Sequence, residues 1–197
     1  MNNELEQLVS VCSWMNTKGY SPATSGNYSI RKDENSCFVS ISGVDKSKLK
    51  TTDFMTYNLD YTYPEFVGKK PSDEAPIHAR IYAMYPKTNC VLHSHSIANT
   101  VLSLADQSEK IEFVNFELLK AFSGVKTHAE PKYLSVVENT QDIIGLAKTL
   151  TPPYDIPGIL VRGHGIYVWG ENVEQTKRHL EGIEFLMQCK LEMMRLK

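Results

Sequence analysis

Short apolar segments of strand length alternate with longer amphipathic segments along the whole chain. Between Leu5 and Met15 the apolar residues recur at three- and four-residue spacing, and the run stops at Gly19. This pattern is typical of an amphipathic helix that ends at a glycine. Residues 28–30, 37–41 and 54–59 then predict strands, which would give a sheet an antiparallel beginning. The alternation continues along the chain and favours an α/β fold.

The remaining segments follow the same order. A helix is expected over residues 72–84, with Ser72 as its N-cap and Pro86 after its end. At residues 159–170, two apolar runs flank Gly163-His164-Gly165 and predict a β-hairpin with a histidine at its tip. The other expected elements are a strand over 90–95, a helix over 97–104, a strand over 110–116, helical stretches over 117–122 and 140–150, and a long helix with a methionine-rich face over 172–196.

The length of the chain limits it to one folded unit. A chain of 197 residues and 22.3 kDa has room for one hydrophobic core. No internal repeat and no linker divides the sequence. We therefore expect residues 1–197 to form a single α/β domain, with a central, mostly antiparallel sheet flanked by helices.

Charge and hydropathy patterning exclude several classes of partner. The formal net charge is -2 and no basic block is long enough to follow a phosphate backbone, so no nucleic acid is expected. No stretch approaches the length of about 18 apolar residues that a membrane span needs. The cysteines lie far apart without a C-x-x-C pair, which argues against a zinc ribbon and a disulfide framework. Residues 1–10 lack the pattern of a signal peptide, and we expect a cytoplasmic protein.

Histidines are the most informative polar residues of the apolar strands. His93 and His95 are two residues apart in a predicted strand, so both imidazoles leave the same face and could bind one metal ion. The pair alone is also compatible with partly buried, hydrogen-bonded histidines. His164 is the best candidate for a third ligand, because its flanking glycines relieve crowding and permit unusual backbone angles. Three imidazoles with an open coordination position are typical of a catalytic divalent-metal site.

The other three histidines are expected outside this site. His78 and His179 lie in predicted helices with polar neighbours, and we expect both of them on the surface. His128 lies in a segment without a clear pattern and is assigned no role.

A catalytic metal site needs a nearby carboxylate to move protons, and two glutamates are candidates. Glu117 lies between Phe116 and Leu118 in an apolar segment, where an unpaired carboxylate is costly. The alternative is an acid at a helix start that faces water. Glu74 lies in the first turn of a predicted helix, where it could simply complement the helix dipole.

Clusters of small polar residues occur at three places that could bind a phosphate through backbone N–H groups and hydroxyls. They are residues 24–27, Ser42-Gly43, and Ser72 at the start of a predicted helix. Each of these clusters is also typical of an ordinary turn.

Five of these motifs resemble, in the same order along the chain, those of the class II aldolase/adducin family of zinc enzymes. They are residues 24–29, Ser42-Gly43-Val44, Pro71-Ser72-Asp73-Glu74, His93-Ser94-His95-Ser96 and Arg162-Gly163-His164-Gly165. The resemblance spans nearly the whole chain, and the hairpin motif is its most specific part. Within the family, residues 160–170 and 116–120 are most similar to a dehydratase that acts on a ketose phosphate.

The resemblance implies a role for each candidate residue. Glu117 would be the general acid/base of a dehydratase, whereas Glu74 would contact the substrate or the metal and could also transfer a proton. The resemblance further implies a homotetramer with sites at subunit boundaries. The zinc ligands would be His93, His95 and His164, and the phosphate would be bound by Asn27, Ser42, Gly43 and Ser72.

One residue departs from the family pattern. Asp73 stands where the aldolases of the family have a second serine in their phosphate site, and its negative charge would repel the phosphate. Either Asp73 points away from the phosphate, or Lys46 or Lys70 compensates its charge.

Two other functions are compatible with the same motifs. An aldolase or 4-epimerase on this scaffold would use the same metal site on another ketose phosphate. A non-catalytic, adducin-like interaction module would keep the fold and lose the histidines, but all three are present here. Imidazole ligands also suit iron, nickel and cobalt, so the choice of zinc rests on the resemblance.

Overall fold

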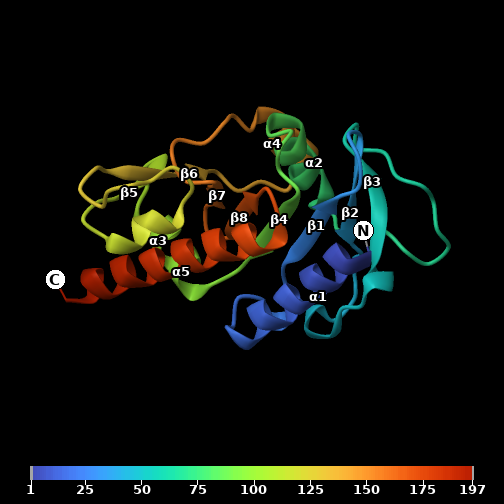
Figure 1. Cartoon of the computed structure of the whole chain (residues 1–197), viewed down its shortest axis with the longest axis horizontal. Coiled ribbons are helices and arrows are strands. Elements are labelled where there is room, and N and C mark those ends of the chain that lie inside the picture. Colours follow the sequence, from blue (N-terminus) through green and yellow to red (C-terminus); the bar gives the residue numbers. More distant parts are fainter. Residues whose placement is uncertain (1, 197) are drawn as a thin grey trace.

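The computed structural model describes residues 2–196. The eight strands of this part form one sheet in the order β3-β2-β1-β4-β8-β7-β6-β5 (Figure 1). Neighbouring strands are antiparallel except for β6 and β7, so the expected central, mostly antiparallel sheet is confirmed. The strands are β1 (Asn27–Arg31), β2 (Ser36–Ser40), β3 (Phe54–Asn58), β4 (Cys90–Ser94), β5 (Lys110–Phe113), β6 (Lys132–Val137), β7 (Gly158–Val161) and β8 (Gly165–Gly170).

Helices cover both faces of the sheet (Figure 1). On one face pack α1 (Asn2–Thr17), α3 (Ile97–Ala105) and α5 (Val173–Arg195). On the other face pack α2 (Ala75–Met84) and α4 (Ile143–Thr149). Short 3-10 helices connect these elements at Pro22–Thr24, Lys46–Lys48, Thr51–Asp53 and Glu117–Ala121.

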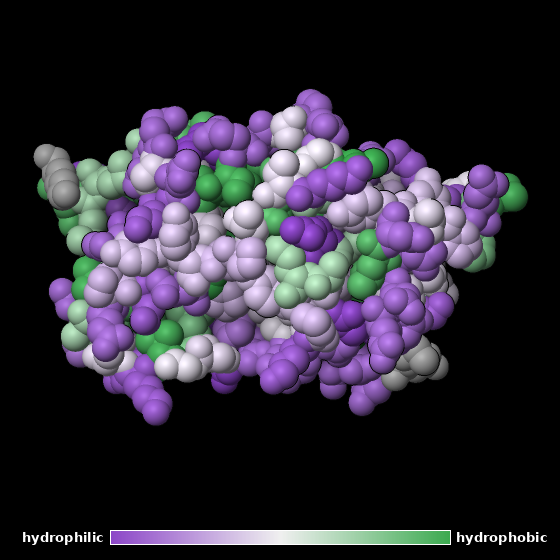
Figure 2. Space-filling view, turned by 90° about the horizontal axis from the view of Figure 1, so that it is seen from above, coloured by the Kyte–Doolittle hydropathy of each residue, from purple (hydrophilic) through white to green (hydrophobic). Residues whose placement is uncertain are grey.

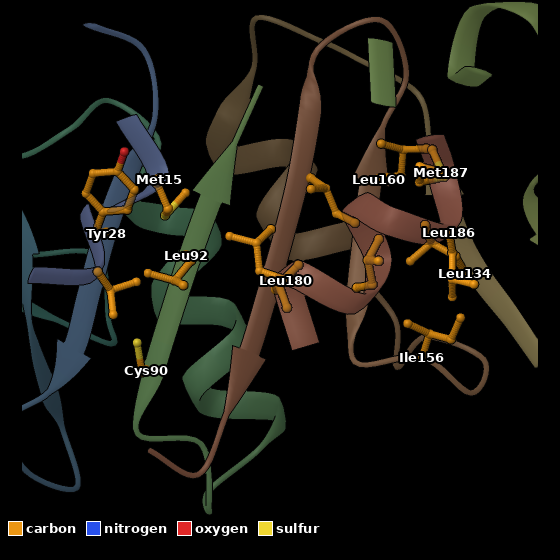
Figure 3. Close-up of a cluster of buried hydrophobic side chains, with 14 of the residues drawn as sticks. Met15, Tyr28, Cys90, Leu92, Leu134, Ile156, Leu160, Leu180, Leu186 and Met187 are labelled. Atoms are coloured by element: carbon orange, nitrogen blue, oxygen red, sulfur yellow. The ribbon is translucent and has the colours of Figure 1, made fainter. Parts of the chain in front are cut away.

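The sheet separates two hydrophobic clusters. Successive strand residues point to opposite faces, so Tyr28 and Leu92 join the cluster under α1 and α5, whereas Val91 joins the cluster under α2 and α4. Figure 3 shows the first cluster, where Met15 of α1 and Leu186 of α5 lie over the same side of the sheet. Burial on both faces explains why β4, β7 and β8 are apolar at successive positions.

The surface over α2 and α4 is mostly hydrophilic. Figure 2 shows this side, on which hydrophobic residues gather only in small groups. The methionine-rich side of α5 is divided: Met187 is buried, whereas Met193 and Met194 are about half-exposed. No helix of residues 2–196 is both long enough and apolar enough to cross a membrane.

The structure corrects two expected helix and strand boundaries. The helix after Pro71 begins at Ala75, so its N-cap is Glu74 and not Ser72. Ser72 instead closes a turn before the helix, with its carbonyl oxygen 3.0 Å from the Ala75 nitrogen. The expected strand 90–95 ends at Ser94, which leaves His95 in the connection to α3.

One strand lies in a segment for which no element was expected. β6 pairs in parallel with β7 and antiparallel with β5, and so extends the sheet beyond the hairpin. Its partners are distant in the sequence, and the parallel pairing is the departure from an otherwise antiparallel sheet.

Candidate metal centre

The three histidines proposed as metal ligands lie together at one end of the sheet. His93 is in β4, His95 follows the end of β4, and His164 lies in the turn between β7 and β8. The ring centroid of His93 lies 4.4 Å from that of His95 and 5.0 Å from that of His164. One ring nitrogen from each of the three lies within 4.8 Å of the other two. Three convergent nitrogens from two segments are compatible with the donor set of a divalent-metal site.

Glycines allow the hairpin tip to approach β4 this closely. Gly163 has a φ of 63°, in the left-handed region that side chains disfavour. At Gly165, a Cβ would lie 2.2 Å from the carbonyl oxygen of Ser94 and 3.0 Å from Cε1 of His93. Gly163 is therefore required by its backbone angle, and Gly165 is required by the closeness of β4.

His93 has a defined tautomer. Its Nδ1 lies 3.0 Å from the carbonyl oxygen of Ile166, which can only accept, so Nδ1 carries the proton and Nε2 has a lone pair. Burial lowers the pKa of His93 well below its usual value and keeps the ring neutral. Its Nε2 is buried without a hydrogen-bond partner in the described part of the chain, and lies 3.4 Å from Oε2 of Glu74. A lone pair and a carboxylate in this position fit a shared cation.

Glu74 brings a carboxylate to these histidines from the start of α2. Its Oε1 lies 3.0 Å from Nε2 of His164, and its Oε2 accepts a hydrogen bond from Nδ2 of Asn27. Burial opposes ionisation, but the contacts with His164, His93 and Asn27 hold the pKa of Glu74 well below its usual value. Its side chain makes no cap hydrogen bond to α2, so the carboxylate faces the histidines and not the helix backbone.

The other histidine of the pair is also neutral. Burial, and then the neighbouring His164, lower the pKa of His95 to about 4. A neutral imidazole is the form that binds a metal ion.

The ring of Tyr167 stacks on that of His93, with centroids 4.0 Å apart and planes at 9°. The stacking restricts the orientation of the His93 ring, a contact that the sequence motifs did not indicate.

The small polar segments proposed for phosphate binding are brought to the same end of β1 and β2. The backbone nitrogen of Ser72 donates to the carbonyl oxygen of Ser40 at 3.1 Å, and that of Ser42 donates to the carbonyl oxygen of Lys70 at 2.9 Å. The segment before α2 therefore lies beside Ser42 and Gly43. Asn27, at the start of β1, is buried and bonded to Glu74.

Asp73 is paired with one of the two lysines considered for it. Nζ of Lys70 lies 3.0 Å from Oδ1 of Asp73, and both side chains are exposed. Lys46 is buried and donates to the carbonyl oxygen of Ile41 at 2.7 Å. Lys70 thus neutralises the charge that departs from the family pattern.

Glu117 has no hydrogen bond or ion pair with the histidine cluster within residues 2–196. Its side chain is 70% exposed and pairs with Lys120 at 2.6 Å and with His128 at 3.1 Å. The hydrogen bond from Lys120 lowers the pKa of Glu117. In the single chain, Glu117 is an acid that faces water at a helix start, and His128 is its partner.

His78 and His179 are buried, so the expectation that they lie on the surface is wrong. Nδ1 of His78 lies 2.7 Å from Oγ of Ser29, and Nδ1 of His179 lies 2.9 Å from the carbonyl oxygen of Trp169. Ser29 lies in β1, 49 residues from His78, and Trp169 lies in β8, ten residues before His179. The polar neighbours within each helix carry no information about these partners. The spacing of Glu74, His78 and Tyr82 at intervals of four residues, on one helix face, was the available signal.

Glu184 supports the connection that carries His95. This residue of α5 is buried and accepts hydrogen bonds from Oγ of Ser94 at 2.7 Å and from Nδ2 of Asn99 at 2.9 Å. Burial raises the pKa of Glu184. The two bonds fasten the residue before His95 and the first turn of α3 to the same carboxylate.

Arg162 supports the turn that carries His164. Its buried guanidinium donates to the carbonyl oxygens of Ser103 and Asp106, at 2.6 and 2.5 Å, where α3 ends. The backbone nitrogen of Gly163 also donates to Oγ of Ser103 at 2.9 Å. The hairpin tip is thereby bound to the last turn of α3.

Comparisons with known proteins give relatives over nearly the whole chain. The family model of the class II aldolase and adducin N-terminal domain, which describes sequences, matches residues 6–191. The chain is 40% identical over 195 residues to a methylthioribulose-1-phosphate dehydratase of Serratia proteamaculans, and the match covers 97% of this chain and 95% of the relative. A protein of the same name from Citrobacter koseri is 40% identical over 199 residues, which cover 99% of this chain and 97% of the relative.

Solved structures share the fold at lower identity. The L-fuculose-1-phosphate aldolase of Thermus thermophilus has a TM-score of 0.75 and 20% identity, over 97% of this chain and 95% of that chain. The sugar-phosphate aldolase of Thermotoga maritima has a TM-score of 0.71 and 19% identity, over 100% and 97% of the two chains. The expected class II aldolase-like fold is confirmed. With the match over nearly its whole length, the chain belongs to the class II aldolase/adducin family.

Proposed function

We propose that this chain is a dehydratase that converts 5-methylthioribulose 1-phosphate to 2,3-diketo-5-methylthiopentyl 1-phosphate and water, a step of methionine salvage. One observation carries the proposal: the three gathered histidines occur in a chain that is 40% identical, along 97% of its length, to a protein named for this activity. The enzyme would be a carbon–oxygen lyase.

His93, His95 and His164 would hold the metal ion, which we propose to be Zn²⁺. Neutral nitrogens with free lone pairs suit zinc, and a buried Nε2 without a partner, as in His93, fits such a ligand. Bound zinc would supply Lewis acidity that polarises the C2 carbonyl of the ketose and acidifies the proton on C3. The Glu74 carboxylate would keep the imidazoles oriented and contact the substrate beside them.

The phosphate of the substrate would lie at the ends of β1 and β2. Ser42 and Ser72 would offer hydroxyls there, and Gly43 would leave room for the phosphate, since nothing lies within 4 Å of the position of its Cβ. Asn27 would contact the substrate with the amide hydrogen that Glu74 does not use. The Lys70 partner of Asp73 would remove the repulsion that Asp73 alone would cause.

Glu117 would be the general acid/base. Its carboxylate would take the proton from C3, the C4 hydroxyl would leave as water after protonation, and the resulting enol would tautomerise to the diketone. Because Glu117 is exposed in the single chain, this role requires the homotetramer that the family resemblance implies, with Glu117 of one subunit beside the histidines of the next.

We further propose a cytoplasmic location, which suits the four free cysteines of the described residues.

A product assay on zinc-loaded protein tests the reaction. With methylthioribulose 1-phosphate, the dehydratase product keeps every carbon of the substrate and lacks one water. An aldolase would break C3–C4 and give dihydroxyacetone phosphate and (methylthio)acetaldehyde. The second products would refute dehydration.

Glu117→Gln tests the assigned base. The variant should lose turnover by about 10²–10⁴-fold, because the amide cannot accept the proton, and should still bind zinc. Glu130→Gln is the matched control, since Glu130 is also exposed and paired with a lysine, Lys132. An active Glu117→Gln enzyme would refute the assignment.

An aldolase or 4-epimerase is the second candidate, because Glu74 and not Glu117 lies at the histidines of a single chain. Fuculose 1-phosphate and ribulose 5-phosphate in the same assay distinguish these activities. Elemental analysis addresses the adducin-like interaction module, which should purify without stoichiometric zinc.

A further inference from the structure

A line of buried polar side chains connects the interior of α2 with Glu74. Oη of Tyr82 lies 2.8 Å from Oγ of Ser29, which lies 2.7 Å from Nδ1 of His78. Nε2 of His78 bonds to Oδ1 of Asn27 at 2.5 Å. Nδ2 of Asn27 in turn donates to Oε2 of Glu74. The hydrogen bonds of this line reach the proposed metal ligands through Glu74. The His78 ring also contacts the edge or face of Tyr167, which stacks on His93, and phenylalanine at position 78 would keep a ring there.

The sequence places these residues by two periodicities. Asn27 and Ser29 are two apart in β1, so both point to the face of the sheet that α2 covers. Glu74, His78 and Tyr82 are four apart, so they follow one side of α2. A strand and a helix that pack together thereby form one continuous polar contact inside an apolar layer.

Each hydrogen bond in this line can have only one direction. An ionised carboxylate only accepts, so Asn27 turns its Nδ2 to Glu74 and its Oδ1 to His78. A carbonyl oxygen only accepts, so Nε2 of His78 carries the proton and its Nδ1 accepts from Ser29. The hydroxyl hydrogen of Ser29 is used in the bond to His78, so its oxygen accepts a hydrogen bond from the Tyr82 hydroxyl. Every donor along the line therefore points toward Glu74.

Burial leaves these groups no water as an alternative partner. His78 and Ser29 are 0% exposed and Tyr82 is 1% exposed. Burial also lowers the pKa of His78 to about 4, so the ring is neutral near neutral pH. The neutral His78 ring, with both nitrogens hydrogen-bonded, cannot flip its orientation without breaking two buried hydrogen bonds.

We propose that His78 is a positioning residue that fixes the Asn27 amide and, through it, the Glu74 carboxylate between His93 and His164. The inference rests on the proposed function of this site. Without the Nε2–H of His78, the Asn27 amide could turn its oxygen to Glu74, and the carboxylate would move away from that oxygen. The metal ligands themselves would remain, so zinc binding and turnover should respond differently.

Substitution of His78 separates positioning from simple loss of stability. His78→Phe should lower kcat by about 10–100-fold, the usual effect of losing a partner behind a metal site, with stoichiometric zinc and a much smaller change in KM. His78→Gln should restore kcat to within a few-fold, because its amide can donate to Asn27 from nearly the same place. His179→Phe is the matched control: it removes another buried, hydrogen-bonded histidine, outside this line, and should lose stability but not kcat.

A spectroscopic measurement tests the inference without activity. Nitrogen-15 NMR of the imidazoles, in zinc-loaded and zinc-free protein, should show His78 as the neutral Nε2–H tautomer near neutral pH. An Nδ1–H tautomer, or a mixture, would overturn the proposal, and so would equal losses of kcat in His78→Phe and His78→Gln. If the wild-type protein dehydrates none of the substrates, the proposed function fails while the tautomer result still decides the role of His78.

Discussion

Replacing Gly165 with alanine would insert one methyl group between β8 and β4, next to the His93 ring. The added Cβ would lie 2.2 Å from the carbonyl oxygen of Ser94, and backbone cannot yield as a flexible side chain can. To relieve the contact, β8 must move away from β4 at the pair Ser94↔Ile166, and the carbonyl oxygen of Ile166 accepts from Nδ1 of His93. Steric strain of about 1–3 kcal/mol and the loss of one hydrogen bond, about 0.5–1.5 kcal/mol, give a destabilisation of about 1.5–4.5 kcal/mol.

The same movement should weaken metal binding. Once Ile166 withdraws, Nδ1 of His93 loses the acceptor that fixes its tautomer, and loss of such a partner costs about 10–100-fold in metal affinity. Urea unfolding measures the free energy of unfolding, and competition with a chromophoric chelator measures the zinc affinity. Both should fall in Gly165→Ala.

Gly124→Ala is the matched control for this substitution. Gly124 has a φ of 83° and nothing lies within 4 Å of its Cβ position, so alanine there introduces backbone strain alone, of about 1–2 kcal/mol. Its zinc affinity should equal that of the wild-type protein. The reasoning is wrong if Gly165→Ala binds zinc as tightly as the control, since the hairpin would then not depend on the close approach to β4.

Two further predictions concern pH and metal removal. In the folded protein the pKa of His78 is about 4, below its ordinary value of 6.5, so the folded state disfavours protonation of this ring. The difference contributes about 3 kcal/mol to the free energy of unfolding above pH 6.5, and this contribution is lost as the pH falls toward 4. Urea unfolding at a series of pH values should show this loss, and a smaller one in His78→Phe; equal slopes would contradict it. Zinc at a thousandfold excess over its Kd should add about 4 kcal/mol, so a chelator should lower the Tm of the wild-type protein but not of His164→Ala. An unchanged wild-type Tm would contradict the proposed ligand set.

Most of the helices and strands could be predicted, because local patterns of apolar residues and glycines indicate them; β6 is an exception. The spacing of apolar residues in α1 and the two apolar runs around Gly163-His164-Gly165 each specify an element without reference to the rest of the chain. His93, His95 and His164 were identified for the same reason, since strand alternation and flanking glycines are local features. The structure brings the three together, as expected.

What the sequence did not indicate depends on contacts between distant segments. The burial of His78 depends on a partner in β1, 49 residues away, and the spacing of Glu74, His78 and Tyr82 was its one local signal. His179 bonds to the carbonyl oxygen of Trp169, ten residues before it, a backbone contact that no side-chain pattern indicates. The strand β6 has alternating Leu134 and Val136 that could have indicated it, but its parallel partner lies more than twenty residues away. Glu117 differs again, because its proposed role depends on a second subunit and the single chain shows it facing water.

Helix α3 contacts the segments of two proposed ligands, His95 at its first residue and His164 at its last turn. Its N-cap, Ser96, directly follows His95, and the carbonyl oxygens at its other end hold the guanidinium of Arg162, two residues before His164. The nine residues of α3 therefore connect the segment that carries His95 with the hairpin tip that carries His164, and the two ring centroids lie 4.9 Å apart. We expect a residue inserted into α3 to displace His95 relative to His164 without replacing either histidine, and we expect natural variation in this helix to keep its length.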